Sequence, residues 1–233
     1  MTERATTAQV AITCRNVTKT YGAGDNLVHA LRGIDLDVET GELLMLVGPS
    51  GCGKTTLISV VAGILDRSGG DCSVFGQDFS AMSQSARTRF RGLNIGFVFQ
   101  AYNLIPSLTA AENAAVPLLL NGVKMRDALE RAQDMLGRVG LGDRAASLPS
   151  QLSGGQMQRV AIARALVHDP KILIADEPTG NLDSAIGDDV LRLLRRGADQ
   201  FGIAVLMATH SAEAAAYADR RVRMRDGRIA EIE

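Results

Sequence analysis

The sequence lacks an excess of either charge and lacks a long apolar run. Its formal net charge is −1, whereas a nucleic-acid binder is usually clearly basic, so we expect no nucleic acid as a partner. The apolar stretch 114–120 contains Pro117 and falls well short of the roughly 20 residues that a membrane-spanning helix needs. Residues 1–9 form a polar tail without the apolar core of a signal peptide. We expect a soluble chain that reaches a membrane only through a partner.

Cysteine is also scarce. The three cysteines, Cys14, Cys52 and Cys72, have no metal-ligand spacing and make no even disulfide set, so we expect a reducing, cytoplasmic setting. Hydrophobic residues make up 46% of the chain and charged residues 22%, which is typical of a soluble globular protein. The 233 residues can bury a substantial core, as one large domain or two small ones.

The pattern of apolar residues predicts an α/β fold. Short β-like runs separated by turns predict antiparallel strands near the N-terminus, at residues 10–14, 27–31 and 34–38. Continuous apolar runs predict strands buried on both faces, at residues 43–47, 95–99, 171–175 and 204–208. Helical periodicity is expected after the first buried strand, through residues 57–64, and again at 110–139 and 156–168. This alternation favours a mostly parallel sheet with an inserted helical lobe, and Asp226-Gly227 predicts a closing hairpin.

The segment after the first buried strand fits the phosphate-loop pattern G-x-x-x-x-G-K-[ST]. Its residues are Gly48, Pro49, Ser50, Gly51, Cys52, Gly53, Lys54 and Thr55. Glycines let backbone N–H groups converge on phosphate oxygens at a helix N-terminus. We expect Lys54 to reach the β- and γ-phosphates and the Thr55 hydroxyl to ligate Mg²⁺.

Two adjacent carboxylates end the strand predicted at 171–175. A carboxylate at such a strand end can hold Mg²⁺, usually through its waters. We expect Asp176 to be the acid on the metal side and Glu177 to be the base that orients or deprotonates the attacking water.

Two further polar residues follow core strands. Gln100 ends its strand in the same way, where a neutral amide senses the metal or the attacking water. His210 follows the strand at 204–208 and is expected to contact a γ-phosphate. His29 and His168 lack such a position, and we expect both to be structural.

A second glycine-rich turn, Leu-Ser-Gly-Gly-Gln at 152–156, opens another helix, which Ser153 caps. One domain has no obvious need for two phosphate cradles around one triphosphate. The simplest resolution is that the second cradle serves a nucleotide bound by another copy of the chain.

Taken in order along the chain, these motifs resemble those of the ATP-binding-cassette (ABC) ATPases. The resemblance covers the phosphate loop, Gln100, the signature 152–156 with its continuation to 161, the acidic strand end, the loop 181–184 and His210. In that family two cassettes close head to tail, and each ATP lies between the phosphate loop of one and the signature of the other.

The resemblance implies a role for each matching residue and two cofactors, ATP and Mg²⁺. Tyr21 would stack on adenine, and Asp183 would couple the two sites. Catalysis would rest on Glu177, His210, Gln100 and Lys54, and the metal would be held by Thr55, Gln100 and Asp176. The nucleotide would be bound by the phosphate loop together with Thr56. From the partner chain it would be bound by Ser153, Gly154, Gly155 and Gln156, with Ser153 and Gly155 at the γ-phosphate.

Finer detail resembles the lipoprotein-releasing and macrolide-exporter branch. The segments concerned are residues 102–109 with Glu112-Asn113, and residues 176–184. This branch implies a homodimer on a separate integral membrane permease, at the cytoplasmic face of the inner membrane, that drives export or mechanical work. The groove near residues 100–108 would seat a helix of the permease, which would also select the cargo. Three positions depart from the pattern: the short turn 66–71, Ser211 after the histidine, and Cys52 in the loop.

We expect a single domain over residues 1–233, with a nucleotide-binding core at about 10–100 and 166–233 and a helical signature subdomain at about 101–165. One alternative is a soluble, non-transport ABC ATPase, although such proteins usually carry a long coiled-coil insertion or a second cassette. An unrelated phosphate-loop kinase or GTPase would leave residues 152–156 and His210 without a purpose. A cassette that binds ATP without turnover is disfavoured because Glu177 and His210 are both present.

Overall fold

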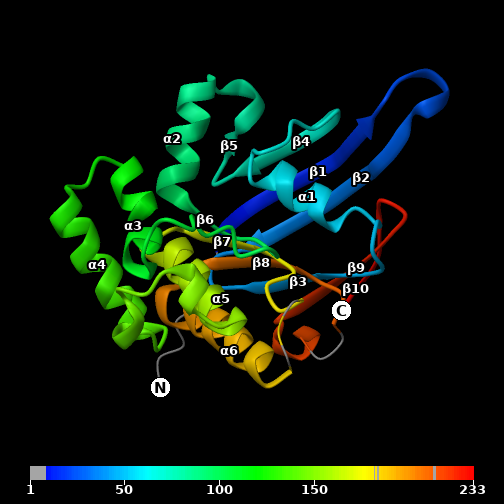
Figure 1. Cartoon of the computed structure of the whole chain (residues 1–233). Helices are drawn as coiled ribbons and strands as arrows, with labels where there is room; N and C mark the ends of the chain where they lie inside the picture. The colour runs from blue at the N-terminus through cyan, green and yellow to red at the C-terminus, as the bar shows by residue number, and fades with distance from the viewer. Residues whose placement is uncertain (1–8, 181, 183, 212–213) are drawn as a thin grey trace, which may run out of the picture.

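The computed structural model describes residues 9–180, 182, 184–211 and 214–233. Two β-sheets and the helices around them form the molecule (Figure 1). One sheet is antiparallel and four-stranded, and the other is six-stranded and mostly parallel. The predicted α/β class, with its N-terminal antiparallel part, is confirmed.

The antiparallel sheet has the order β2-β1-β4-β5. Its strands are β1 (Val10–Tyr21), β2 (Val28–Glu39), β4 (Gly69–Val74) and β5 (Gln77–Asp78). The prediction of separate strands at 27–31 and 34–38 is wrong, because β2 runs through both. Gly33 takes a φ of 85°, and the β1–β2 register shifts beside it, between Cys14 and Val17. Glycine adopts this left-handed conformation without strain, so the chain forms a bulge there instead of a turn.

The larger sheet has the order β10-β9-β3-β8-β7-β6. Its strands are β3 (Leu43–Val47), β6 (Ile95–Val98), β7 (Ile172–Asp176), β8 (Ala204–Thr209), β9 (Arg220–Arg225) and β10 (Arg228–Ile232). Only the β9–β10 pair is antiparallel. The four predicted buried strands and the closing hairpin are therefore confirmed. The chain order of the strands differs from their spatial order, which brings distant segments to one sheet edge.

Six α-helices and five short 3-10 helices are present in the described part of the chain. The α-helices are α1 (Lys54–Val61), α2 (Gln84–Asn94), α3 (Ala110–Leu120), α4 (Met125–Arg138), α5 (Gly154–Leu166) and α6 (Ser184–Phe201). The 3-10 helices are η1 (Gly24–Asn26), η2 (Phe79–Ala81), η3 (Gly142–Arg144), η4 (Pro149–Gln151) and η5 (Ala214–Tyr217). The helical region predicted at 110–139 is thus two helices, and sequence reasoning did not assign α2 or α6.

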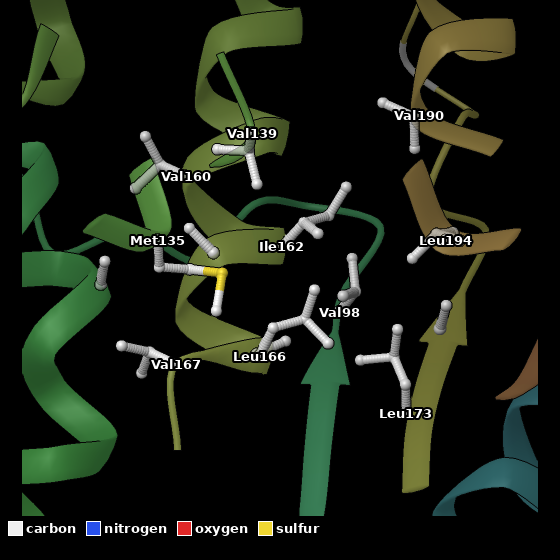
Figure 2. Packing of buried hydrophobic residues seen from close by; sticks show 14 of the residues in the cluster. Val98, Met135, Val139, Val160, Ile162, Leu166, Val167, Leu173, Val190 and Leu194 are labelled. Atoms are coloured by element: carbon white, nitrogen blue, oxygen red, sulfur yellow. The ribbon is translucent and has the colours of Figure 1, made fainter. Parts of the chain in front are cut away.

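The larger sheet separates two hydrophobic clusters. Helix α1 packs in the cluster between the two sheets, whereas α3, α4, α5 and α6 pack in the cluster on the other face (Figure 1). Neighbouring residues of one strand face opposite clusters because side chains alternate along a strand, so that Leu173 and Ile174 of β7 lie in different ones. Figure 2 shows Val98 and Leu173 from the sheet against Ile162 and Leu194 from the covering helices.

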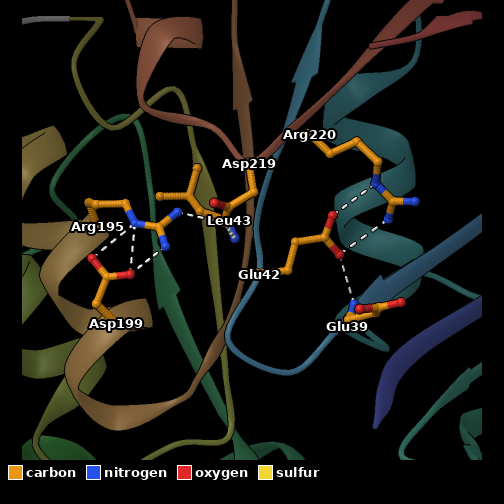
Figure 3. Close-up of polar contacts among 7 residues, drawn as sticks. All are labelled: Glu39, Glu42, Leu43, Arg195, Asp199, Asp219 and Arg220. Atoms are coloured by element: carbon orange, nitrogen blue, oxygen red, sulfur yellow. Dashed lines mark hydrogen bonds and ion pairs between the residues drawn. The ribbon is translucent and has the colours of Figure 1, made fainter. Parts of the chain in front are cut away.

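Ion pairs join α6 to the larger sheet (Figure 3). Arg195 of α6 pairs with Asp199 and with Asp219, and the Asp219 carboxylate accepts a 2.8 Å hydrogen bond from the Leu43 N–H. On β9, Arg220 pairs with Glu42 at 2.8 Å. These contacts hold the starts of β3 and β9 beside the end of α6.

Helix α5 approaches the sheet very closely. The carbonyl oxygen of Ala165 lies 2.1 Å from the position that a Cβ at Gly96 would occupy. His168, just after the helix, has its Nε2 3.2 Å from the Ile95 carbonyl oxygen, and burial lowers the pKa of this imidazole. His168 is structural, as expected. In the described residues, we find no helix that is both long enough and apolar enough to cross a membrane.

Gly96→Ala is expected to lower the free energy of unfolding by about 1–3 kcal/mol, because the added methyl group meets backbone and forces α5 away from the sheet. Gly137→Ala in α4 is the matched control. A Cβ there meets nothing within 4 Å, and alanine is the better helix former, so stability should rise slightly. Urea denaturation of both variants measures the difference. Equal effects of the two substitutions would contradict the close approach.

Candidate functional site

The phosphate loop connects β3 to α1 and is enclosed by two neighbouring strands. A Cβ at Gly48 would lie 2.3 Å from the Met224 carbonyl oxygen of β9, and one at Gly53 would lie 2.6 Å from the Ala30 carbonyl oxygen of β2. Gly53 also has a φ of 106°. Glycine is therefore required at both positions by contact as well as by conformation. Pro49, Ser50 and Gly51 form the exposed crest between them.

Lys54 is the first residue of α1 and folds back under the loop. Its Nζ donates hydrogen bonds to the carbonyl oxygens of Gly48 at 2.7 Å and Pro49 at 3.1 Å. The side chain is only 5% exposed. The ammonium group is thus held inside the loop, at a helix N-terminus where the dipole favours an anion.

Cys52 is buried beside this lysine. Its Sγ lies 4.0 Å from Lys54 Nζ and 3.0 Å from the position of a Cβ at Gly48. The thiol packs within the loop, as expected for a position that takes small residues. Thr56 follows in α1 and is half-buried.

Thr55 and Asp176 meet across the sheet edge. The Thr55 hydroxyl donates a 3.2 Å hydrogen bond to Asp176 Oδ1, although the two residues lie on α1 and at the end of β7. Burial is the largest of the effects that raise the pKa of Asp176, and the bond from Thr55 opposes it. A hydroxyl beside a half-buried carboxylate is a donor set that suits Mg²⁺, which takes few protein oxygens and keeps several waters. Within the described ranges, no three His, Cys, Asp or Glu side chains form a metal cluster.

Glu177 and His210 form a close pair beside this carboxylate. His210 Nδ1 lies 3.2 Å from Glu177 Oε2, because β7 and β8 are parallel neighbours and both residues follow the strand ends. Glu177 has a φ of 47°, and its N–H bonds to the Ala208 carbonyl oxygen at 2.9 Å. A non-glycine residue in the left-handed region costs free energy and is found chiefly at functional sites.

Gln100 points to the same place from the end of β6. Gln100 Nε2 and Glu177 Oε2 lie 3.5 and 3.6 Å from one point, the position of a Cβ at Gly180. The structure therefore brings together four segments that are far apart in sequence: the phosphate loop, Gln100, the acidic pair and His210. They meet at the carboxyl edge of the parallel sheet, where ligands of open α/β folds bind.

The turn 152–156 lies elsewhere, at the start of α5 on the opposite face of the sheet from α1 (Figure 1). Ser153 caps the helix as predicted: its Oγ accepts the Gln156 N–H at 3.3 Å, and Gln156 Oε1 accepts the Ser153 N–H at 2.9 Å. Ser153 is exposed, whereas Gly155 is buried, with Ile186 only 2.5 Å from the position of a Cβ there. A Cβ at Gly154 would lie 2.9 Å from the Tyr102 hydroxyl. The turn is therefore exposed at Ser153, whereas Gly154 and Gly155 pack against other residues of the same chain.

Tyr21 ends β1 opposite Val28 of β2, the strand whose Ala30 touches the phosphate loop. The ring is 41% exposed, and Lys19 Nζ lies 5.1 Å from its centroid. Asp183 lies outside the described residues.

Residues 31–180 match the protein-family model described as ABC transporter. The chain belongs to this family.

Relatives in the ABC family support the branch resemblance. The chain is 47% identical over 215 residues to the lipoprotein-releasing system ATP-binding protein LolD of Geobacter metallireducens, covering 92% of this chain and 95% of that protein. It is 45% identical over 215 residues to the macrolide export ATP-binding/permease protein MacB of Rhodopirellula baltica, covering 91% of this chain and 31% of that protein. The resemblance to the lipoprotein-releasing and macrolide-exporter branch is thereby confirmed.

The fold is also that of solved ABC cassettes. A dimeric post-hydrolysis structure of the ATP-binding cassette MJ0796, bound to ADP and Pi, has a TM-score of 0.88 at 36% identity and covers 95% of this chain and 97% of that one. CbiO1 of Clostridium perfringens, part of the complex cbiONQ, has a TM-score of 0.86 at 29% identity, covering 96% and 88%.

Sequence reasoning missed two residues that hold the segment after Gln100. Arg164 of α5 donates to the carbonyl oxygens of Tyr102 at 2.8 Å and Asn103 at 2.5 Å, and burial lowers the pKa of its guanidinium. Asn113 of α3 is fully buried and binds the backbone between residues 105 and 109. Asn113 was noticed only as part of the branch pattern. An amide among the small, buried residues of α3, next to the capping residue Glu112, was the available signal.

Asn113→Ala is expected to lower the free energy of unfolding by about 1–3 kcal/mol, because it strips partners from the buried backbone of the 105–109 segment. Asn121→Ala is the matched control, since that amide is exposed and makes one 2.7 Å bond to the Gly92 carbonyl oxygen; its effect should stay within about 0.5 kcal/mol. Denaturant titration compares the two. Hydrogen exchange at residues 105–109 should quicken only in the Asn113 variant, and unchanged protection there would contradict the assignment.

Proposed function

We propose that the chain binds and hydrolyses ATP at sites shared by two copies, and that the closure of the dimer drives a separate membrane permease. The observation that carries the proposal is the convergence of Glu177, His210 and Gln100 beside the Thr55–Asp176 pair and the phosphate loop. Membership of the ABC transporter family supports ATP as the nucleotide. A solved neighbour in a post-hydrolysis state with ADP and Pi supports hydrolysis.

ATP would lie with its phosphates on the loop and its adenine on the half-exposed ring of Tyr21, where stacking contributes on the order of 1–3 kcal/mol. Lys54 would exchange its bonds with the loop carbonyls for bonds to the β- and γ-phosphates. The cradle residues would be Gly48, Pro49, Ser50, Gly51, Cys52, Gly53, Lys54, Thr55 and Thr56. The backbone N–H groups at the start of α1 then add the helix dipole to the attraction.

Thr55, Asp176 and Gln100 would hold Mg²⁺, which neutralises charge on the β- and γ-phosphate oxygens when it is bound. The Thr55–Asp176 contact supports this, because the two oxygens already face one another. Burial of Asp176 without a cation is unfavourable for its charge. A bound cation removes that penalty.

Glu177 would act as the base toward the attacking water. His210 keeps one carboxylate oxygen of Glu177 in place through its Nδ1, and the strained backbone at Glu177 aims the side chain at the sheet edge. The Gln100 amide nitrogen and Glu177 Oε2 both lie close to Gly180, at 3.5 and 3.6 Å from the position of a Cβ there, so a water bound near both groups would have a base and an amide within reach. Hydrolysis then rests on positioning as well as on proton transfer.

The turn 152–156 would complete the site of a second copy. In one chain this turn and α1 pack on opposite faces of the larger sheet. The turn is therefore badly placed to contact a nucleotide that is bound to the phosphate loop of the same chain. Its exposed Ser153, at a helix N-terminus, suits an incoming γ-phosphate, with Gly154, Gly155 and Gln156 allowing close approach. Dimeric cassettes among the solved structures support the pairing of two copies. Asp183 would couple the two sites.

ATP contacts both chains only when they are closed, so it binds the closed state more tightly. This difference in affinity is the source of force. Loss of the γ-phosphate removes the bridge, and the dimer reopens. The helical lobe, at about residues 101–165, would move with the signature relative to the core.

A groove of about 1040 Å³ is the proposed seat of a permease helix; residues 100–108, where the seat was expected, do not line it, and Phe99 is the lining residue nearest to them in sequence. It lies between α2, the end of α3 and β6, and its apolar lining includes Ile64, Leu93, Phe97, Phe99 and Leu120. Arg89 and Arg91 are the charged residues of the lining, and no acidic residue joins them. A permease helix with apolar and acidic side chains fits this surface, and Phe99, which precedes Gln100 in the chain, links it to the site. The chain would then lie at the cytoplasmic face of the inner membrane, held by the permease.

The branch relatives favour this function over a soluble, non-transport ABC ATPase. They support export or mechanical work across the envelope, because one is named for lipoprotein release and one for macrolide export. Cargo selection would belong to the permease.

Glu177→Gln should bind ATP but lose turnover by at least 100-fold, because the base is removed and the charge that opposes closure is neutralised. The variant should therefore form a stable dimer with ATP. Glu130→Gln on the exposed face of α4 should behave like the parent. Phosphate release and analytical ultracentrifugation measure the two properties. A Glu177 variant that stays monomeric with ATP, or turns over at the parent rate, contradicts the mechanism.

Leu120→Asp should abolish copurification with the permease while leaving basal ATP hydrolysis intact, because the 82% exposed side chain lines the groove far from the phosphate loop. Ile232→Asp on β10 is the control, since it is also exposed, at 52%, but lies at the other end of the sheet. Affinity purification from detergent-solubilised membranes tests both. Retained permease in the Leu120 variant would place the docking site elsewhere.

A further inference from the structure

Two cysteines far apart in sequence face one another in the antiparallel sheet. Cys14 of β1 and Cys72 of β4 are direct register partners, and their Sγ atoms lie 3.7 Å apart. Both are buried, at 0% and 3% exposure. The odd number of cysteines gave no sign of this pair, because only the strand pairing brings the two thiols together.

The backbone already meets the requirement for a disulfide bond. Directly opposite residues of an antiparallel pair have Cα atoms about 4.5–5.5 Å apart, inside the range of roughly 4.4–6.8 Å that disulfides span. The bond therefore requires a change of side-chain rotamers and no movement of the strands. The third cysteine, Cys52, lies in the phosphate loop beside Lys54.

The two thiols differ in reactivity. The hydrogen bond from Cys14 lowers the pKa of Cys72, and the guanidinium group of Arg67 acts in the same direction. The same hydrogen bond and burial raise the pKa of Cys14. Cys72 is also nearer the sheet edge, since the outer strand β5 pairs only with Ser73 and Val74 of β4. We therefore assign Cys72, which lies just beyond the β5 pairing, as the nucleophile and Cys14 as its resolving partner.

We propose that Cys14 and Cys72 are an oxidative modification site, which closes to an intramolecular disulfide in the presence of a hydroperoxide. The Cys72 thiolate attacks one peroxide oxygen, the O–O bond breaks, and the alkoxide or hydroxide that leaves takes up a proton. The resulting Cys72 sulfenic acid is attacked by Cys14 sulfur, the S–O bond breaks, and the Cys14 proton leaves with the oxygen as water. In total, two thiols are oxidised to one disulfide. One hydroperoxide is reduced to an alcohol and one water, or to two waters when the peroxide is hydrogen peroxide.

The bond ties β1 to β4 around the loop of chain that holds β2, β3 and the phosphate loop. It constrains the unfolded chain more than the folded one, so the oxidised protein resists unfolding. The hydrogen bond of the two thiols, within the described chain, joins them to one another and to no residue of the proposed ATP site. ATP hydrolysis is therefore unchanged by the bond.

The test treats the folded, full-length protein with hydrogen peroxide, quenches it, and alkylates it in denaturant before peptide mass spectrometry. The expected result is one cross-linked peptide pair containing Cys14 and Cys72, with the loss of two hydrogen atoms and full reversal by dithiothreitol. The thermal midpoint should rise on oxidation and return on reduction. Alkylation of both thiols after peroxide, or a cross-link between two chains, would overturn the proposal.

Single variants separate the two roles. In Cys14→Ser, Cys72 should be trapped as a sulfenic acid by dimedone, because the hydroxyl group can still donate a hydrogen bond to Cys72 but cannot resolve the sulfenic acid. In Cys72→Ala, Cys14 should stay reduced under the same dose. Equal labelling of the two variants would contradict the assignment of nucleophile and partner, whereas the mapping of the parent protein tests the bond without any substitution.

Discussion

The chemistry of this chain depends on one constraint, the alignment of four parallel strands that end at the same sheet edge. β3, β8, β7 and β6 are consecutive neighbours, so the segments that follow them meet although they are spread from Gly48 to His210. The 3.2 Å contacts of Thr55 with Asp176 and of Glu177 with His210 are direct products of that order. Hydrophobic clusters on both faces hold the strands, and α5 approaches the sheet closely enough to demand glycine at position 96.

Groups whose burial or backbone strain costs folding free energy gather at the same sheet edge, and bound ATP and a cation would offset part of that cost. Lys54 is a buried cation, Asp176 is a half-buried carboxylate, and Glu177 takes a strained backbone conformation. Such features cost stability in the free protein and hold the groups ready in position. The signature turn is different, because its Ser153 is exposed and makes only capping bonds to Gln156 in its own chain. One side of the proposed shared site is thus assembled within a single chain, whereas the Ser153 turn is exposed on the surface of that chain.

Much of this was predictable from local sequence. The buried strands were identified from continuous apolar runs, and the phosphate loop and the Ser153 cap from residue types at fixed spacing. The β2 strand was wrongly divided in two because Gly33 suggested a turn. In the structure β2 continues through Gly33, and the change of register between β1 and β2 is made by a bulge in β1 between Cys14 and Val17. The roles of Arg164 and of the Cys14–Cys72 pair were not found, because each acts through contacts between segments distant in sequence. Asn113 was quoted only as part of the branch pattern, although its partners, residues 105–109, are close in sequence. Helix α2 was missed because none of its residues is fully buried and Phe90 is the one that packs on a core cluster, so its sequence carries little apolar periodicity.

The central claim is that each ATP lies between the phosphate loop of one copy and the Ser153 turn of the other. Complementation tests it most directly, with Lys54→Ala and Ser153→Arg made separately in a Glu177→Gln background and ATP-dependent dimers measured by analytical ultracentrifugation. Neither variant alone should form dimers, because every site has one damaged side. An equal mixture should form mixed dimers that hold one ATP, since one of the two sites is intact. A mixture that stays as monomeric as its parents, with both variants folded, would contradict the shared site.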